Sequence, residues 1–269
     1  SPLAREELPH LDVAMRGARP RWMSVSMIIQ EGFGIDDLRK IVRSIREACD
    51  ADGVHVITGD TKVVGRSAAD GIFVTTTGVG ERFAEPAPGA TAARPGDRVI
   101  VSGTLGDHGI CILAAREELS LKQGVQSDCA SLLSPTEAMI DAGGPAVRTL
   151  RDMTRGGMSA ALNEIAMSSQ VSIEIEEVSV PVRREVQGAC ELLGMSPFEI
   201  ANEGKLMAVV APEAAEDVLE AMHTHPLGAD AAIVGTVGDG RVGRVSARTP
   251  LGTSRLIDLP AGELLPRIC

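Results

Sequence analysis

A stretch rich in proline, glycine and alanine, residues 84–97, divides the chain into two segments that are each long enough to form a domain. It begins Ala84-Glu85-Pro86-Ala87-Pro88-Gly89, and proline and glycine at this density interrupt both helices and strands. The whole chain has 269 residues, which is enough for two ordinary domains. We therefore expect a first domain over residues 1–83 and a second over residues 97–269.

Hydrophobic periodicity predicts both strands and helices in each segment. Residues 22–29 alternate between apolar and polar, as in a half-buried strand, whereas apolar side chains recur at helical spacing from Ile35 to Cys49. Residues 1–21 are polar and are expected to be irregular. Because strands and helices do not alternate strictly, the patterns favour an α+β fold over a doubly wound sheet. Further strands are expected at 54–57, 72–77, 98–102, 171–175, 205–211, 231–237 and 242–247, and further helices at 109–118, 158–167, 183–193 and 213–222.

The composition argues against several classes of protein. A net charge of −11 repels nucleic acids and anionic membrane surfaces, and four Phe, one Trp and no Tyr offer no platform for stacking bases. No signal peptide is visible, and the early apolar run at residues 25–29 is far too short to span a membrane. Five scattered cysteines without a CxxC pair indicate neither a zinc site nor a disulfide framework, so we expect a cytoplasmic location.

Two glycine-rich segments, residues 103–109 and Arg155-Gly156-Gly157, could bind phosphate. Backbone N–H groups at the start of a helix suit an anion, although an ordinary structural turn explains such glycines more often.

Two acidic segments could each provide either a functional ligand or a structural turn. Asp60, at the end of an expected strand with Thr61 and Lys62 beside it, offers an oxygen ligand for Mg²⁺ and a cation for phosphate. A turn in which the carboxylate caps the strand explains Asp60 about equally well. Glu203, in Asn202-Glu203-Gly204-Lys205, presents the same alternatives.

The remaining candidates are histidines and cysteines. His223 and His225 would share one face of a strand, but no third ligand lies nearby and a surface turn is favoured. The terminal Cys269 carries a thiol that could reach another site, whereas most lone cysteines are small buried hydrophobes. The other four cysteines are expected to be packing residues: Cys49, Cys111, Cys129 and Cys190.

Taken together, these segments resemble the HypE family of hydrogenase maturation factors over nearly the whole chain from about residue 15. The internal motifs are shared more loosely with the aminoimidazole ribonucleotide synthetase superfamily, whereas the terminal tetrapeptide is specific to HypE. The segments that carry the resemblance are Thr58-Gly59-Asp60-Thr61-Lys62-Val63-Val64, Ser102-Gly103-Thr104-Leu105-Gly106-Asp107-His108-Gly109, Asp152-Met153-Thr154-Arg155-Gly156-Gly157, Asn163-Glu164-Ile165-Ala166, Ala201-Asn202-Glu203-Gly204-Lys205-Leu206 and Pro266-Arg267-Ile268-Cys269.

The resemblance implies an activity and a set of partners. It implies ATP-dependent dehydration of a carbamoyl group, carried as a thiocarboxamide on Cys269, to a thiocyanate that supplies cyanide for nickel–iron hydrogenase maturation. It implies Mg²⁺ with the ATP, a HypF-type carbamoyltransferase that loads the thiol, and a HypC–HypD complex that accepts the cyanide. It also implies a homodimer formed through the sheet of the first, nucleotide-binding domain.

The resemblance further assigns roles to individual residues. Cys269 is the acceptor, Lys62 a catalytic cation and Glu203 the candidate base, and Asp12 and Asp60 are expected to bind the metal. Nucleotide binding is assigned to Asp12, Asp60, Thr61, Asp152, Thr154, Arg155 and Gly156.

The sequence also departs from the family pattern. The family has an additional N-terminal stretch, with a glycine-rich segment and an acidic metal ligand, that has no counterpart here. Leu11 stands where the family has asparagine, and Met153 where proline is usual. We therefore expect an ATP site that is incomplete on its N-terminal side.

Two other functions stay open at this point. One is a shortened HypE-like scaffold or carrier that presents Cys269 with weak ATP turnover. The other is another ATP-using member of the superfamily, such as a thiamine-monophosphate kinase or a selenophosphate synthetase, against which the terminal tetrapeptide argues.

Overall fold

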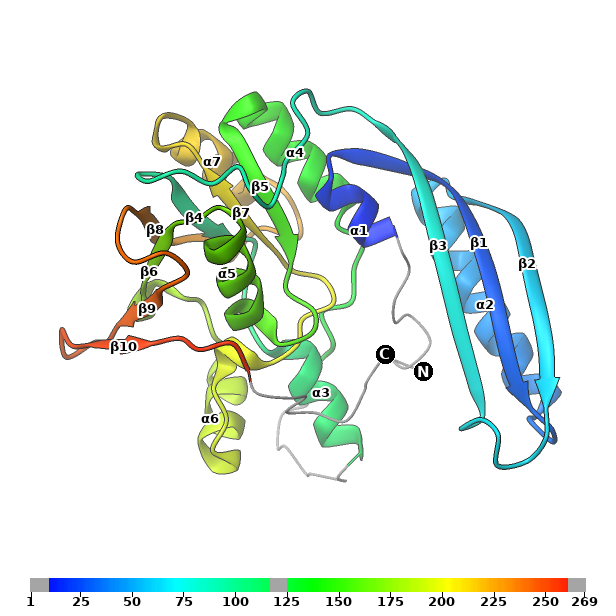
Figure 1. Cartoon of the computed structure of the whole chain (residues 1–269). Helices are drawn as coiled ribbons and strands as arrows, with labels where there is room; N and C mark the ends of the chain where they lie inside the picture. Colours follow the sequence, from blue (N-terminus) through cyan, green and yellow to red (C-terminus); the bar gives the residue numbers. More distant parts are fainter. Residues whose placement is uncertain (1–9, 117–124, 261–269) are drawn as a thin grey trace.

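The computed structural model describes residues 10–116 and 125–260 and shows two sheets, which form separate lobes in Figure 1. The first sheet has three strands in the order β2-β1-β3, and the second has seven in the order β10-β9-β6-β8-β4-β7-β5. Helices pack on both sheets, and the seven-stranded sheet is mainly antiparallel. The predicted α+β class is confirmed.

The three-stranded sheet follows the periodicity of the sequence. Its central strand β1 (Ala18–Gln30) pairs in parallel with β2 (His55–Val64) and antiparallel with β3 (Ile72–Arg82). Helix α2 (Ile35–Asp52) covers one face of the sheet, where Met23 and Val25 pack with Cys49. The alternating strand and the amphipathic helix expected here are therefore confirmed.

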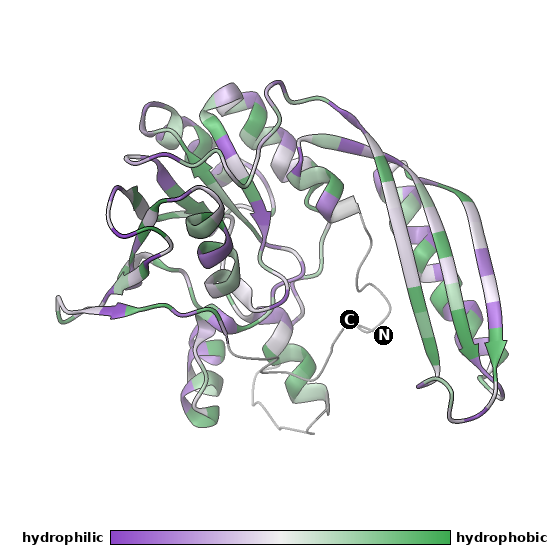
Figure 2. Cartoon of the chain, viewed as in Figure 1, coloured by the Kyte–Doolittle hydropathy of each residue, from purple (hydrophilic) through white to green (hydrophobic). Residues whose placement is uncertain are grey.

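The opposite face of this sheet exposes apolar side chains. Ile28 pairs with Phe73 and Trp22 with Val79, and these four side chains are 39–56% exposed. Figure 2 shows hydrophobic and hydrophilic bands along the three strands. Large apolar groups that alternate with polar ones on an open sheet face are typical of a surface that packs against something else.

Helices cover both faces of the seven-stranded sheet. Alternate residues of its central strands point to opposite sides, and both sets are apolar, so each face packs against its own layer of helices. Val99 and Val209 pack with Leu162 of one helix layer, whereas Ile100 and Ala208 belong to a second core with Met139 and Met222. The strands are β4 (Arg98–Val101), β5 (Val147–Asp152), β6 (Ser172–Glu176), β7 (Leu206–Val210), β8 (Ala232–Gly238), β9 (Val245–Arg248) and β10 (Ser254–Leu256). The helices are α3 (Asp107–Arg116), α4 (Leu133–Gly143), α5 (Gly157–Ser168), α6 (Arg184–Leu193) and α7 (Ala215–Thr224), with short 3₁₀ turns at Gly144–Ala146, Glu177–Ser179, Pro197–Glu199 and Pro212–Ala214.

The start of the described chain is ordered, in contrast to the irregular segment expected there. Helix α1 (His10–Met15) leads directly into β1, and its residues Ala14 and Met15 join the core formed by α4 and α7. A six-residue helix is too short for its apolar spacing to stand out in the sequence. Helix α1 therefore packs in the core of the larger lobe, although it belongs to the segment before residue 83. The domain boundary expected between residues 83 and 97 remains a prediction.

Two further expectations differ from the structure. Strand β2 continues through Val64, so the segment expected after its end lies inside it. His223 lies in the last turn of α7, which ends at Thr224, rather than in a strand. Helix α4 and strand β5 were not expected from the sequence. Among the described residues, no helix is both long enough and apolar enough to cross a membrane.

Candidate functional site

Three loops meet at one edge of the seven-stranded sheet. Strand β7 lies between β4 and β5 and runs antiparallel to both, so its first residues lie beside the last residues of its two neighbours. The loop after β4 leads into α3, the loop after β5 leads into α5, and residues 201–205 enter β7. These loops are the three second-domain segments that the sequence singled out.

The side chain of Asn202 joins the three loops. Asn202 is fully buried, and its Oδ1 accepts the N–H of Gly106 at 2.7 Å. Its side-chain NH₂ donates to the carbonyl oxygens of Met153 at 3.3 Å and Ile200 at 2.9 Å, and its own N–H donates to Met153 at 2.9 Å. A buried amide with its hydrogen-bonding groups satisfied fixes the loops relative to one another.

The predicted phosphate loop combines acidic, basic and backbone groups at the start of α5. Asp152, the last residue of β5, is 7% exposed and accepts a hydrogen bond from Thr154 Oγ1 at 2.9 Å. Arg155 is exposed, and Gly156 adopts a left-handed conformation with φ of 72° before the helix begins. The N–H groups at a helix start and an exposed guanidinium suit a phosphate.

Gly157 allows this loop to pack closely against its neighbour. A Cβ at position 157 would lie 2.5 Å from the carbonyl oxygen of Ile200 and 2.7 Å from that of Phe198. Only glycine permits such an approach. The sequence showed the glycine pair, but only the structure shows what it contacts.

Glu203 lies beside a group of buried charges that the sequence analysis missed. Its N–H donates to Asp128 Oδ1 at 3.0 Å, and Lys205 Nζ lies 3.8 Å from Asp128 Oδ2. Asp107 Oδ2 accepts from Thr104 Oγ1 at 2.5 Å and lies 3.3 Å from Arg183 Nε. Burial raises the pKa of both Asp107 and Asp128 because the charged carboxylate is poorly solvated there.

His108 adds a buried imidazole at the start of α3. Its Nδ1 lies 2.9 Å from Ser127 Oγ and 3.5 Å from Cys129 Sγ, and its side chain is fully buried. Burial lowers the pKa of His108 to about 4, so the ring is neutral at neutral pH. Cys129 is partly exposed and makes polar contacts, which corrects the expectation that it is only a packing residue; Cys49 and Cys190 are buried, as expected, and Cys111 is partly exposed.

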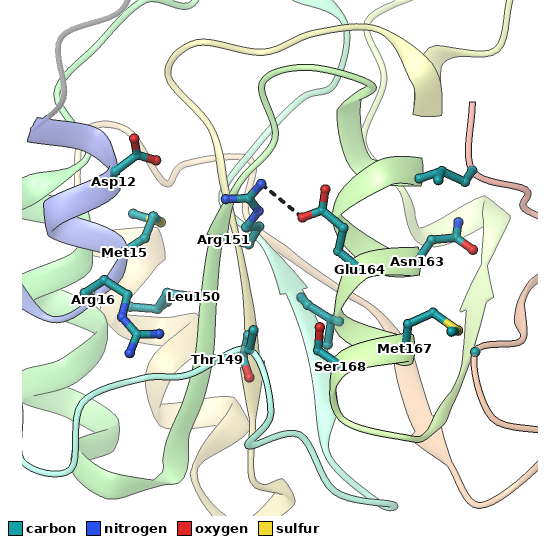
Figure 3. A pocket seen from close by; sticks show the side chains of 14 residues that line it. Asp12, Met15, Arg16, Thr149, Leu150, Arg151, Asn163, Glu164, Met167 and Ser168 are labelled. Atoms are coloured by element: carbon teal, nitrogen blue, oxygen red, sulfur yellow. Dashed lines mark ion pairs between the residues drawn. The ribbon is translucent and has the colours of Figure 1, made fainter. Parts of the chain in front are cut away.

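Asp12 lines a cavity of about 720 Å³ between α1, β5 and α5. Figure 3 shows Asp12 on one side of this cavity and Glu164 on the other, with Arg151 between them. Arg151 Nη2 pairs with Glu164 at 3.0 Å, and Arg151 directly precedes Asp152. The structure therefore places Asp12 on the same cavity as Arg151, the residue that precedes the phosphate loop.

Asp60, Thr61 and Lys62 lie elsewhere. They occupy the interior of β2, an edge strand of the three-stranded sheet, which corrects the expectation that Asp60 lies at the end of a strand. Asp60 pairs with Ser26 and Lys62 with Ile28, so both follow the exposed sheet face, whereas Thr61 alternates to the α2 side. The expected trio is thus split, and it belongs to a different lobe from Asp152 and Glu203.

Neither the expected Asp12–Asp60 pair nor the less favoured histidine pair belongs to a larger cluster of metal ligands in the described part of the chain. Across residues 10–116 and 125–260, no group of three or more His, Cys, Asp or Glu side chains is arranged to hold a metal ion. His223 Nε2 lies 2.9 Å from the carbonyl oxygen of Ala231, and His225 Nε2 lies 3.1 Å from Ser134 Oγ, so the two rings serve separate contacts. Cys269 lies outside the described residues.

Comparison with known proteins gives matches to one family over both parts of the chain. Residues 11–82 match the N-terminal domain, and residues 94–248 the C-terminal domain, of the AIR synthase related proteins. The chain is 48% identical to the carbamoyl dehydratase HypE of Rhizobium leguminosarum bv. viciae over 258 residues, covering 96% of this chain and 74% of that protein.

Solved structures agree with these matches. The chain superposes with a TM-score of 0.93 on a hydrogenase maturation protein HypE in complex with ATP, at 42% identity, over 100% of this chain and 81% of that one. A HypE–HypF complex gives a TM-score of 0.89 at 42% identity, over 96% and 84% of the two chains. The chain therefore shares the fold of these two structures over nearly its whole length.

The central role of Asn202 can be tested with Asn202→Asp, which keeps the size but removes the NH₂ group. The carbonyl oxygens of Met153 and Ile200 would then face a second oxygen, and two buried acceptors without a side-chain donor should lower the free energy of unfolding by about 2–4 kcal/mol. Chemical denaturation measures this change. Asn163→Asp is the matched control: Asn163 also donates to two carbonyl oxygens but is only partly buried, and should lose less than about 1 kcal/mol. Equal losses would contradict the role.

The buried His108 predicts a specific dependence of stability on pH. Between pH 6.5 and about 4 the unfolded chain binds a proton that the folded chain excludes, so stability is lost as the pH falls through this window. In His108→Gln this loss is absent. At pH 8 the variant can have a lower free energy of unfolding than the parent. This difference should shrink by up to about 3 kcal/mol between pH 8 and pH 4, as measured by denaturant titration at each pH. A difference that does not change with pH would contradict the burial of a neutral ring.

Proposed function

Because the chain belongs to the AIR synthase related family, as a carbamoyl dehydratase of the HypE type, we propose that its three loops carry out ATP-dependent dehydration of a carbamoyl group on Cys269. The product is a thiocyanate that supplies cyanide ligands for nickel–iron hydrogenase maturation. The observation that carries the residue assignment is the convergence of Asp152, Thr154, Arg155 and Glu203 at one edge of the sheet.

The first step activates the carbonyl oxygen of the thiocarboxamide. That oxygen attacks the γ-phosphorus of ATP, the bond from the γ-phosphorus to ADP breaks, and Glu203 takes one proton from the amide nitrogen. The N–H groups at the start of α5, with Thr154 and Arg155, bind the phosphates and offset the developing charge. An amide oxygen is a poor leaving group, and a phosphate is a good one.

The second step forms the triple bond. The remaining N–H bond breaks, its electron pair forms the third carbon–nitrogen bond, and the carbon–oxygen bond to phosphate breaks. The departing phosphate retains the original carbonyl oxygen and can hold the second proton. Glu203 releases the first proton to solvent, so that one thiocyanate, one ADP, one phosphate and one proton result from each ATP.

Mg²⁺ accompanies the ATP in this proposal and supplies charge for phosphoryl transfer. Carboxylate oxygens are suitable ligands, and Asp12 and Asp60 would hold the ion together with phosphate oxygens. Asp12 lines a cavity of the larger lobe together with Arg151, whereas Asp60 lies on β2, an edge strand of the three-stranded sheet. In this proposal Asp60 of a second copy completes the donor set.

A homodimer would bring these groups together. The exposed face of the three-stranded sheet carries Trp22, Ile28, Phe73 and Val79 beside Asp60 and Lys62, so burying the apolar residues against a second copy also places the charges at the interface. In a two-fold dimer each chain would give Asp60 and Lys62 to the phosphate loop of the other, whereas Thr61 points to the α2 side of the sheet. Lys62 would then offset charge on the transferred phosphoryl group.

The other partners follow from the chemistry and from the relatives. A HypF-type carbamoyltransferase would load Cys269, and its assembly with HypE is the subject of one of the similar structures. A HypC–HypD complex would accept the cyanide.

The role of Cys269 predicts a modification confined to the terminal peptide. After incubation with the carbamoyltransferase and its substrates, intact-mass analysis should show a carbamoyl adduct that loses one water when ATP and Mg²⁺ are added. Cys269→Ala should show neither change, whereas Cys111→Ala, which removes a partly exposed thiol from α3, should behave as the parent does. An adduct that survives Cys269→Ala would overturn the assignment.

The shared site predicts complementation between two inactive variants. Asp60→Asn loses the charge that binds Mg²⁺ and Glu203→Gln loses the base, so each alone should turn over at least tenfold more slowly. When the two are unfolded together and refolded as a mixture, half of the dimers pair unlike chains and carry one intact site, so roughly a quarter of the parental rate should return. If no activity returns although mixed dimers form, Asp60 and Glu203 do not act across an interface.

A further inference from the structure

We propose that Asp128 is a positioning residue for Glu203, holding from a separate loop the peptide that carries the base. The inference rests on the proposed function, in which Glu203 takes a proton from the amide. Asp128 itself is too deeply buried to touch the substrate, since its side chain is 3% exposed. It therefore acts through the residues it contacts.

The first observation is a backbone hydrogen bond to the residue proposed as the base. Asp128 Oδ1 accepts the N–H of Glu203 at 3.0 Å. A carboxylate that accepts a backbone N–H makes a charge-assisted hydrogen bond, which restrains the peptide that carries the N–H group. Because the Cα–Cβ bond of Glu203 follows its backbone, Asp128 sets the direction in which the side chain of Glu203 leaves the chain.

The second observation is the close contact between the two segments. A Cβ at position 204 would lie 1.8 Å from the carbonyl oxygen of Asp128 and 2.9 Å from the N of Ala130. The residue at 204 must therefore be glycine for Glu203 to stay in place. Residues 125–131 form neither helix nor strand, so their position depends on contacts of this kind.

The third observation concerns charge. A neutral asparagine could accept the N–H of Glu203 equally well, yet the chain buries a carboxylate here, and burial raises the pKa of Asp128. Lys205 Nζ, on a side chain that is 12% exposed, lies 3.8 Å from Asp128 Oδ2. The negative charge of Asp128 thus attracts Lys205, while its hydrogen bond holds the backbone of Glu203. One carboxylate therefore orders the residues on both sides of Gly204.

The loop that carries Asp128 is itself tied to α3. Ser127 and Cys129 flank Asp128, and Ser127 Oγ lies 2.9 Å from His108 Nδ1. The contact runs from α3 through residues 127–129 to Glu203, without passing through Asn202. Asn202 aligns the three loops, whereas Asp128 sets the orientation of one residue within them.

Asp128→Asn tests the inference, with Asp97→Asn as a matched control. Asp97 is also a buried carboxylate that accepts one backbone N–H, from Arg94 at 2.8 Å, and pairs with one cation, Arg148 at 3.0 Å, but it precedes β4 away from the loops. The carbamoylated protein is mixed with saturating ATP and Mg²⁺, and thiocyanate formation is followed by mass analysis in a single turnover. We expect Asp128→Asn to slow this rate at least tenfold while calorimetry shows ATP affinity within twofold of the parent. Asp97→Asn should keep the rate within twofold.

A double variant separates positioning from a general loss of structure. If Asp128 acts through Glu203, adding Asp128→Asn to Glu203→Gln should slow the residual rate no further than twofold, because the group it orients is already lost. A further tenfold loss in the double variant would overturn the inference, as would a parental rate for Asp128→Asn alone. A parental rate for Glu203→Gln alone would instead refute the role of Glu203 in the proposed function.

Gly204→Ala provides a second route if Asp128→Asn does not fold. The added methyl group would displace the carbonyl of Asp128 and separate the two segments without removing any functional side chain. The same tenfold slowing, again absent on a Glu203→Gln background, is expected. A folded Gly204→Ala variant that dehydrates at the parental rate would show that the contact does not position Glu203.

Discussion

The hydrogen bonds of one buried amide, the side chain of Asn202, hold together the loops to which we assign the activity. An antiparallel sheet can deliver the ends of β4 and β5 to the start of β7, but it leaves the loops beyond those ends free to diverge. Asn202 removes that freedom by bonding to Gly106, Met153 and Ile200 at once. Buried polar groups need partners, so the same bonds that satisfy the amide set the spacing between the phosphate loop and Glu203.

The buried ionisable groups that reduce the stability of the fold lie beside this amide. Asp107, Asp128 and His108 are all buried within or beside these loops, and burial disfavours the charged form of each. Such groups reduce stability, and proteins retain them where function requires a fixed charge or an oriented neighbour. The rest of the larger lobe is an apolar core of ordinary kind, able to compensate for local strain at one edge of its sheet.

In the proposed mechanism the two lobes divide the chemistry between them. The larger lobe carries the proposed phosphate loop and base, whereas Asp60 and Lys62 follow an exposed face of the smaller sheet. The apolar side chains on that face would drive association, and the charges beside them would contribute to the reaction. Under the proposed dimer, folding produces two half-sites and assembly completes them.

Much of this molecule is determined by the sequence alone. The strand at residues 22–29 and the helix from Ile35 to Cys49 were predictable because periodicity is a local property. The motifs around Asp152 and Glu203, together with the terminal tetrapeptide that ends in Cys269, indicated the family and the reaction. Only the tertiary structure decided that Asp60 lies inside a strand rather than after it, because pairing with β1 extends β2 beyond its apolar residues. It also decided the partners of the site residues: Asp128 and Glu203 are 75 positions apart, and Gly106 and Asn202 are 96 apart. Such hydrogen bonds depend on which strands become neighbours in the sheet, and no local pattern in a single sequence records that choice.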